Sequence, residues 1–321
     1  MTVRVYTSGD AGAPALRGNT GGDLINLLHK VLVEGYGDHL PAGWTRPFVN
    51  GDVAVFKTGE GSNGMCLRID DSHAHDYVTT YRYARVSGFE NMSDINTGTG
   101  QFPTQDQQDG GLYWHMHYPN SSQTKARAWT IYADEKFFIL NISTHTDLPV
   151  LSSYRETYWF GDYVSTMASD PYSTVIYGKR GYTEVNSSES APYTSSGPGS
   201  PHPGSYFPRS YTGLGGSQGA SLIHDSAKSG QSTWGGTSAL PYPHGPDGAL
   251  MLSPIWIMEP GNSSNTSAAI RGTMPGMWAP LQAVLGHGDK FDGQGELVGR
   301  KFQAMRQYES RLVVETTDNW R

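Results

Sequence analysis

The sequence of 321 residues carries 23 Lys and Arg against 30 Asp and Glu, which gives a formal net charge of −7. The length allows a sizeable core, and the acidic balance excludes the basic field that nucleic acid or an anionic membrane surface would require in a partner. Because Cys66 is the only cysteine, an intrachain disulfide framework and a zinc site built mainly from thiolates are excluded as well.

The composition favours a β-protein whose surface is partly covered by neighbouring molecules. The chain has 40 Gly, 19 Pro, 19 Tyr and 8 Trp, and 17% of its residues are charged, against about 25% in an average globular domain. Many turns, aromatic strands and few solubilising charges are typical of such a protein. The N-terminal residues lack the apolar stretch of an export signal, and no apolar run is long enough to span a bilayer. We therefore expect assembly in the cytoplasm.

The first predicted element is a helix within residues 21–37, "GGDLINLLHKVLVEGYG". Asp23 can act as its cap or as a first-turn acid, and Gly35 provides the stop. Apolar residues recur at helical spacing, at Leu24, Leu27, Leu28 and Val31. The pattern predicts one amphipathic helix that packs on a sheet.

The segments that follow, up to about residue 183, have the pattern of β-strands. A turn is predicted at Asn50 and Gly51, and "ARAWTIYADEKFFILNIS" is predicted as a hairpin that turns at Ala133 to Lys136. Further strands are expected in "GMCLRID", "YVTTYRYARVSGF", "GLYWHMHY", "ETYWFGDYV" and "STVIYGKRG". Strands and helices do not alternate, which argues against a doubly wound nucleotide-binding fold.

Residues 184–247 are dense in Ser, Gly and Pro and cannot build a core from their own side chains. Single aromatic residues are nevertheless inserted there, at Tyr193, Tyr206, Phe207 and Tyr211. These rings predict a long arm that becomes ordered on its own domain or on a neighbouring subunit, so the four residues are interface candidates.

The expected fold is therefore α+β and mainly β, with antiparallel sheets, one N-terminal helix and a long Gly/Ser/Pro-rich arm. Composition divides the chain into three parts. Residues 1–183 form a helix and an antiparallel β domain, residues 184–247 form the extended arm, and residues 248–321 form a C-terminal β-region.

Two pairs of histidines raise the question of a metal site. His115 and His117 lie two apart in a predicted strand, and His73 and His75 lie two apart in "DDSHAHDY", so each pair could present two imidazoles to one ion. A cupin-like site would also need an acid a few residues later, and none follows His117 at that spacing. We interpret the first pair as strand residues and the second as part of an exposed, acidic turn formed with Asp70, Asp71 and Asp76.

Two further motifs offer catalytic or ligand-binding chemistry. "GGSQG" matches the G-x-S-x-G nucleophile elbow with Ser217 at its centre, and His224 and Asp225 follow. That elbow requires a buried strand before the serine and a helix after it, and the flanking sequence predicts neither. "HGDKFDGQGE" lacks the spacing of a calcium loop and is interpreted as a tight, Gly-rich hairpin that carries Asp289, Asp292 and Glu296. A serine hydrolase that uses Ser217 remains an alternative function.

The tryptophans support a second alternative. Exposed rings can stack on sugars, and the candidates for such platforms are Trp114, Trp159, Trp234 and Trp278. A carbohydrate-binding or receptor-binding module is therefore the other alternative.

The N-terminal part contains "VYTSGDAGAPALRGNTGGDLINLLHKVLVEGYG" and "AGWTRPFVNGDVAVFKTGEGSNGMCLRIDD", and the C-terminal part contains "RGTMPGMWAPLQ", "GDKFDGQGELVGRKF" and "VVETTDNW". This pattern resembles virion structural proteins of tailed bacteriophages, namely components of the tail, baseplate or neck. The resemblance covers both ends of the chain, omits the Ser/Gly/Pro-rich region and brings no catalytic residues with it. It implies a structural subunit of a virion that uses no catalysis and no cofactor and contacts other virion proteins and copies of itself in a ring.

Overall fold

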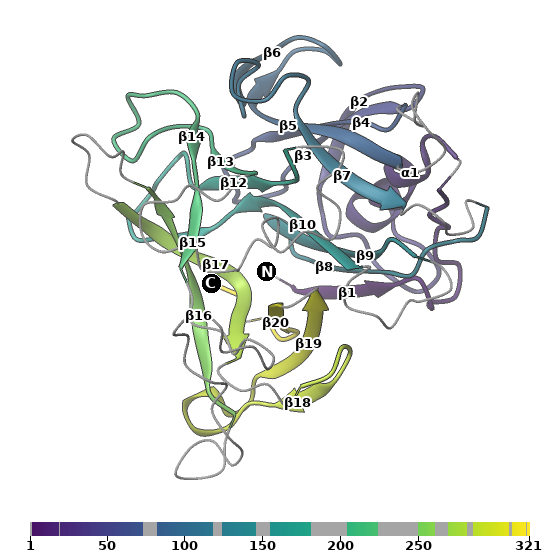
Figure 1. The fold of residues 1–321 in the computed structure, drawn as a ribbon, viewed down its shortest axis with the longest axis vertical. Coiled ribbons are helices and arrows are strands. Elements are labelled where there is room, and N and C mark those ends of the chain that lie inside the picture. The colour runs from purple at the N-terminus through teal and green to yellow at the C-terminus, as the bar shows by residue number, and fades with distance from the viewer. Residues whose placement is uncertain are drawn as a thin grey trace, which may run out of the picture.

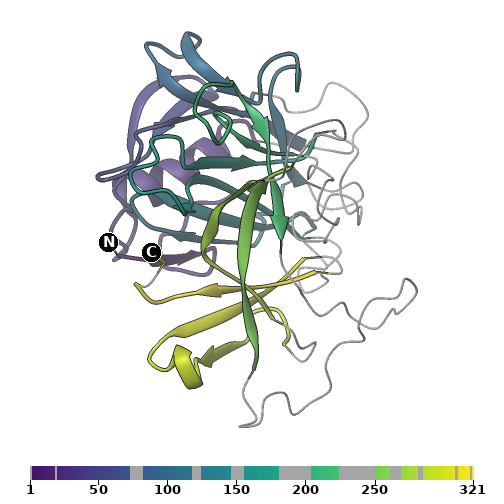
Figure 2. The same ribbon diagram turned by 90° about the vertical axis from the view of Figure 1, so that its left-hand side faces the viewer.

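The computed structural model describes residues 2–18, 20–72, 82–117, 124–145, 155–180, 204–223, 250–260, 269–280, 285–307, 310–318 and 320–321. In these residues the fold consists mostly of antiparallel sheets with one α-helix near the N-terminus, which confirms the expected fold class. The third sheet forms the lower part of the molecule in both views, and the helix lies beside the other two sheets (Figure 1, Figure 2).

The predicted helix is present as α1 (Asp23–His29), which continues into a π-helical turn, η1 (Lys30–Glu34). The chain leaves this turn at Gly35 with φ of 90°, a conformation that favours glycine. Asp23 is the first residue of the helix and therefore a first-turn acid, and its side chain makes no cap hydrogen bond. Its carboxylate accepts a hydrogen bond from the backbone N–H of Arg17 at 2.9 Å. The Leu24 N–H instead donates to the carboxylate of Asp71 at 3.0 Å, so a distant residue caps the helix.

The first sheet supplies most of the aromatic core. Its strand order is β1 (Arg4–Thr7), β8 (Trp129–Ala133), β9 (Phe137–Ser143), β10 (Arg155–Asp162), β12 (Thr174–Tyr177), β13 (Ser205–Phe207) and β14 (Gln218–Gly219). The predicted hairpin is confirmed as β8 and β9, and the Asp134 carboxylate accepts from two backbone N–H groups in its turn. Every residue of β9 and β10 is buried.

The second sheet holds the predicted Asn50 and Gly51 turn. Its order is β2 (Thr45–Asn50), β3 (Val53–Lys57), β4 (Cys66–Asp70), β5 (Arg82–Met92) and β6 (Gly98–Phe102), with β7 (Leu112–His117) also paired to β5. Asn50 pairs with Val53, and Gly51 has φ of 55° in the two-residue connection.

The third sheet contains the C-terminal strands. Its order is β15 (Ser221–Ile223), β16 (Leu252–Glu259), β17 (Ala269–Pro280), β20 (Ser310–Glu315), β19 (Lys301–Gln307) and β18 (Lys290–Asp292), and β11 (Val164–Ser165) pairs with β17. A 3-10 turn, η4 (Gly295–Leu297), lies in the connection from β18 to β19.

Two segments of chain pass from the first sheet to the third. One runs from β10 through Tyr163 into β11, and the other runs from β14 through Ala220 into β15. The described part of the expected arm, residues 204–223, therefore adds strands to both sheets and is ordered on its own chain. The first and third sheets therefore each contain strands from both sides of residue 183.

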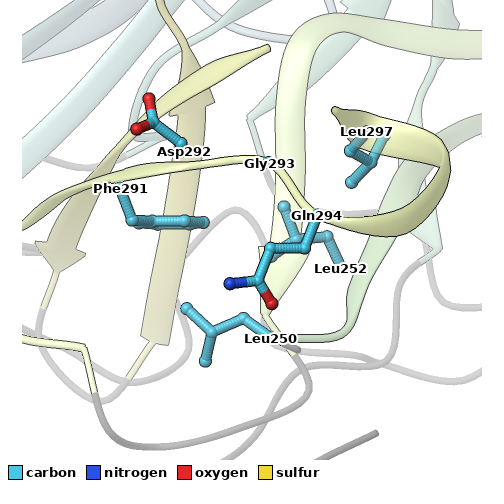
Figure 3. Close-up of a pocket in the computed structure, with 7 residues that line it drawn as sticks. All are labelled: Leu250, Leu252, Phe291, Asp292, Gly293, Gln294 and Leu297. Carbon is cyan, nitrogen blue, oxygen red and sulfur yellow. The ribbon is translucent and has the colours of Figure 1, made fainter. Parts of the chain in front are cut away.

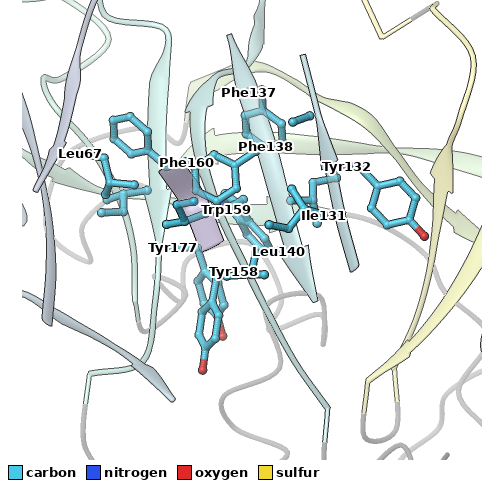
Figure 4. Packing of buried hydrophobic residues seen from close by; sticks show 14 of the residues in the cluster. Leu67, Ile131, Tyr132, Phe137, Phe138, Leu140, Tyr158, Trp159, Phe160 and Tyr177 are labelled. Atoms are coloured by element: carbon cyan, nitrogen blue, oxygen red, sulfur yellow. The ribbon is translucent and has the colours of Figure 1, made fainter. Parts of the chain in front are cut away.

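Aromatic stacking fills the space between the sheets. Trp159 stacks on Tyr177 with ring centroids 4.4 Å apart, and Trp114 stacks on Tyr158 at 5.3 Å. Figure 4 shows several of these rings packed together on the strands of the first sheet. Because flat rings bury a large area with few rotatable bonds, they give this short-stranded, Gly-rich chain a dense core.

A buried ion pair fixes the helix to the second sheet. Arg82 Nη2 lies 2.6 Å from the carboxylate of Asp71, and both side chains are inaccessible to solvent. Arg82 also donates to the backbone oxygen of Arg17. Burial is the largest influence on the pKa of Asp71 and raises it, whereas the Arg82 charge and the hydrogen bond from Leu24 lower it. The pair thus joins β4, β5, the helix and the N-terminal loop.

Replacing Arg82 by Met is expected to lower the free energy of unfolding by about 3–5 kcal/mol, because the carboxyl of Asp71 would stay buried without its cation. Arg68→Met is the control at a partly exposed site: Arg68 Nη2 is 3.9 Å from the Asp70 carboxylate, and the guanidinium donates to the Ile95 backbone oxygen and to the Asn96 side chain. Water can replace these contacts, so this variant should lose clearly less stability than Arg82→Met. Urea unfolding at pH 7 measures both values, and equal losses would contradict this role of the buried pair.

The first and third sheets also meet through polar groups. The Tyr132 hydroxyl on β8 donates to the side-chain oxygen of Gln303 on β19 at 2.7 Å. His287 lies near Arg155 of β10, and burial, followed by the charge of Arg155, lowers the pKa of His287 to about 4. This histidine is therefore neutral in the folded protein at pH 7.

Acid should destabilise the fold through His287. The unfolded chain binds a proton on this residue near pH 6.5, whereas the folded chain does so only near pH 4. The stability that depends on neutral His287 is thus complete above pH ~6.5 and is lost as the pH falls toward 4. In thermal unfolding at several pH values, His287→Gln should lose less stability between pH 7 and 4.5 than the wild type, and identical losses would refute the assignment.

Candidate functional site

The structure does not bring the predicted metal-site histidines into a described cluster. His115 pairs with Tyr83 and His117 with Arg82 in the ladder of β7 and β5, as the strand interpretation expects. His73 and His75 lie outside the described residues. Within the described ranges, no three His, Cys, Asp or Glu side chains lie close enough to hold a metal ion.

The expectation of an exposed acidic turn at 70–76 is wrong for Asp71. Its side chain is fully buried in the pair with Arg82, whereas Asp70 accepts a hydrogen bond from the N–H of Ser72 at 3.1 Å. Asp76 lies outside the described residues. Sequence alone could not separate these neighbours, because the partner of Asp71 is eleven residues away.

Ser217 lacks the surroundings of a nucleophile elbow. Its side chain is buried, and the chain continues into β14 and β15 rather than into a helix. The elbow requires an exposed hydroxyl at a strand-to-helix turn. His224 and Asp225 lie outside the described residues.

The three acids of the predicted Gly-rich hairpin are exposed: Asp289 lies just before β18, Asp292 is its last residue, and Glu296 lies in the connection from β18 to β19. Asp292 pairs with Lys301, so the connection spans residues 293–300 and is longer than the tight turn that the sequence predicts. Asp289 accepts a hydrogen bond from the N–H of Gly286 at 2.6 Å, which is local turn chemistry.

Two of the four candidate sugar platforms are core residues. Trp114 and Trp159 are fully buried, so their faces are not available for stacking on a sugar. Trp278 is partly exposed under the guanidinium of Arg300, 4.9 Å from the ring centroid. Trp234 lies outside the described residues.

The four interface candidates also include both buried and exposed residues. Phe207 is fully buried and Tyr206 is buried on β13, so both rings belong to the core of their own chain. They are buried because β13 pairs with β12 of the first sheet, so these rings pack into the core of that sheet. Tyr211 is 50% exposed and stays an interface candidate. Tyr193 lies outside the described residues.

Tyr211 belongs to an uncharged surface that we call the loop surface. It consists of the exposed residues of 166–169 and 211–216 together with Ile270. The large apolar side chains on it are Met167, Tyr211, Leu214 and Ile270, which are 54%, 50%, 91% and 55% exposed. None of the residues in these two loop segments is charged.

Hydrogen bonds place these parts side by side at one end of β17. The N–H of Thr166 donates to the backbone oxygen of Arg271 at 2.9 Å, which brings Met167 next to Ile270. The N–H of Tyr211 donates to the carboxylate of Glu259 at 2.7 Å. Glu259 pairs with Ala269 in the ladder of β16 and β17, so both loops meet at the start of β17.

Arg271 holds the loop surface from beneath. Its side chain is 3% exposed, and its guanidinium lies 3.1 Å from the Glu259 carboxylate and 3.8 Å from the Asp170 carboxylate. The same group donates to the backbone oxygen of Arg209 at 3.1 Å and lies over the ring of Phe207. One buried cation therefore contacts both loops and joins the end of β16 to the start of β17.

Arg209 fixes the second loop to the second sheet. Its guanidinium makes two hydrogen bonds with the carboxylate of Glu90, at 2.6 and 2.8 Å, and lies over the ring of Tyr172. The hydrogen bond with Glu90 raises the pKa of Arg209. Charges near the loop surface are thus paired with one another, while the outermost side chains are apolar.

This arrangement has the properties of a protein-binding surface. Charged residues are depleted at the centre of protein interfaces, and a surface that is already ordered loses less entropy on binding. Sequence reasoning missed Met167, Leu214 and Ile270. The one signal it could have used is Leu214, an apolar residue in the polar, Gly-rich stretch "YTGLGG". Within the described ranges, none of the helices has the length and hydrophobicity of a membrane span.

Arg271→Met should loosen the loop surface. Glu259 and Asp170 would remain near each other without their cation, so we expect the free energy of unfolding to fall by about 3–5 kcal/mol. Amide hydrogen exchange should accelerate in residues 165–172 and 209–216 more than in β8 and β9. Arg209→Met removes a partly exposed pair and should affect only the second loop. Unchanged exchange in both loops of the Arg271 variant would refute the role of Arg271.

The chain matches no protein-family model, and no curated protein is significantly similar to it.

Proposed function

We propose that this chain is a structural subunit of a tailed-bacteriophage virion, located in the tail or baseplate, and that the loop surface joins it to a neighbouring subunit. The observation that carries the proposal is the ordered, uncharged surface formed by Met167, Tyr211, Leu214 and Ile270. The resemblance of both ends of the sequence to virion structural proteins supports the same conclusion.

The energy of such a contact favours repeated assembly over isolated pairs. Burying one large apolar side chain contributes about 1.5–3 kcal/mol, and the loop surface offers four that are at least half exposed. Association of two proteins costs roughly 4–15 kcal/mol in lost freedom. A single contact is therefore weak, whereas a closed ring gives every subunit two contacts.

The sheet edges favour side-chain contacts over the extension of a sheet by a neighbour. β2 is an edge strand, but it contains Pro47, which has no N–H to donate, and a register shift between Thr45 and Phe48. Both features discourage a further strand from pairing there. β18 at the edge of the third sheet has only three residues.

Purified wild-type chain should show a mass that increases with concentration in sedimentation velocity, and electron microscopy of the assembled material should show closed rings. The double variant Leu214→Asp with Ile270→Asp should associate at least about tenfold more weakly, because it places two charges in the contact. Leu40→Asp is the matched control, since Leu40 is 68% exposed outside the loop surface. A wild-type chain that stays monomeric at the highest concentration reached would overturn the proposal.

A further inference from the structure

The sequence contains two Asn-Gly pairs, Asn50–Gly51 and Asn63–Gly64. In such a pair the backbone nitrogen of the glycine can attack the side-chain carbonyl carbon of the asparagine, because glycine has no side chain to hinder the approach. The nitrogen loses its proton, a C–N bond forms, and the side-chain amide leaves as ammonia, so the product is a cyclic imide. Water then opens the imide at either carbonyl group and gives aspartate or isoaspartate. The reaction consumes one water for each ammonia released and needs no enzyme.

The first pair lies at the exposed end of a hairpin. Asn50 is the last residue of β2, and both Asn50 and Gly51 are exposed. Among the described residues, no group accepts a hydrogen bond from the Gly51 N–H, and none bonds to the side-chain amide of Asn50. The space beside Gly51 is open, since a Cβ placed there would have no heavy atom within 4 Å. Because β2 is an edge strand, the rotation that brings the reacting atoms together disturbs only the last pair of the ladder, with Val53.

The second pair is held in place by hydrogen bonds. The Gly64 N–H donates to the hydroxyl of Ser62 at 3.1 Å, so the attacking nitrogen is already engaged. The side-chain amide of Asn63 hydrogen-bonds with the Ser173 hydroxyl at 3.0 Å, and the backbone N–H of Asn63 donates to the Asp162 carboxylate at 2.7 Å. Asn63 and Gly64 are both half-buried. Ring closure at this pair therefore requires the hydrogen bonds of the nitrogen and of the side-chain amide to break.

Asp-Gly pairs close the same ring less readily, because a carboxylate is a poorer electrophile than an amide. One such pair, Asp292–Gly293, lies beside a small apolar pocket at the connection from β18 to β19 (Figure 3). The Gly293 N–H donates to the backbone oxygen of Arg300 at 2.8 Å, so the attacking nitrogen is engaged here as well. The exposed asparagine pair differs from both of these pairs in having a free nitrogen and a free amide.

We propose that Asn50 is a site of spontaneous deamidation in the folded protein and that the fold protects Asn63 from the same reaction. The two pairs are chemically alike, so the difference between them comes from the structure. Breaking two hydrogen bonds before ring closure slows the reaction at Asn63 at least about tenfold relative to Asn50. This inference does not depend on the proposed function.

Modification of Asn50 changes a turn that contacts the start of the helix. The Asp71 N–H donates to the backbone oxygen of Asp52 in this turn at 2.8 Å, and a Cβ placed on Gly21 would lie 2.5 Å from the Asp52 carboxylate. Isoaspartate adds one carbon to the backbone of the two-residue connection, and the new carboxylate adds a negative charge close to Asp52. Amide hydrogen exchange should therefore become faster in β2 and in the turn, whereas the buried strands β8 and β9 should keep their protection.

Peptide mapping by mass spectrometry tests the proposal on the wild-type chain, incubated at neutral and mildly alkaline pH with and without urea. In the folded chain, the peptide that contains Asn50 should convert into two products of equal mass, aspartate and isoaspartate. This conversion should be at least about tenfold faster than the conversion at Asn63. In urea, where neither pair keeps its hydrogen bonds, the two pairs should react at similar rates.

Two variants separate the contributions of the two pairs. Ser62→Ala frees the Gly64 N–H and should accelerate the reaction at Asn63 at least about twofold without changing the rate at Asn50. Asn50→Gln keeps an amide at the exposed turn but requires a larger ring, so conversion at this position should stop.

Equal rates at the two pairs in the folded chain would overturn the proposal, and so would an unreacted Asn50 in a folded chain whose urea-unfolded form reacts. A single product at Asn50 would also overturn it, since direct hydrolysis of the amide gives aspartate alone. An unchanged rate at Asn63 in the Ser62→Ala variant would refute the protective role of that hydrogen bond.

Discussion

The guanidinium of Arg271 is the contact on which the arrangement of sheets and loops depends. It extends from β17 of the third sheet to the ring of Phe207 on β13 of the first sheet, and it binds carboxylates from β16 and from the loop after β11. Because arginine offers five donors in a rigid plane, one side chain can satisfy several elements at once. The same contacts that join two sheets also order the surface that we assign to assembly.

Buried ion pairs connect separate elements of the fold. Arg82 and Asp71 join the helix to the second sheet, and Lys179 pairs with Glu156 at 3.0 Å with both side chains almost fully buried. A buried charge is tolerated only beside its partner, so each pair specifies which segments must meet. The remaining surface is free to be apolar, as the loop surface shows. The low content of charged residues thus fits two features: several charges are used in buried pairs inside the protein, and the loop surface is uncharged.

Each proposed contact would be weak by itself, so assembly would depend on the arrangement of several subunits and not on the strength of one contact. Weak, directional contacts of this kind allow wrongly placed subunits to dissociate before a ring closes.

The sequence by itself determined the elements whose signals are local. The apolar spacing from Leu24 to Val31 specified the helix, and the run from Trp129 to Ser143 specified the hairpin of β8 and β9, because periodicity and turn chemistry act between near neighbours. The mainly β fold class was predicted from the many turn-forming and aromatic residues and from the alternating pattern of the strands, and these signals also do not depend on distant contacts.

Only the tertiary structure decided how the chain uses residues that interact over long separations. It buried Asp71 against Arg82, turned Tyr206 and Phe207 from interface candidates into core, and brought Met167, Leu214 and Ile270 to one surface. Residue 167 and residue 270 meet because β11 pairs with β17, a contact across about a hundred residues that no local pattern encodes. Both the core and the loop surface are formed by segments that are far apart in the sequence and meet only through sheet pairing.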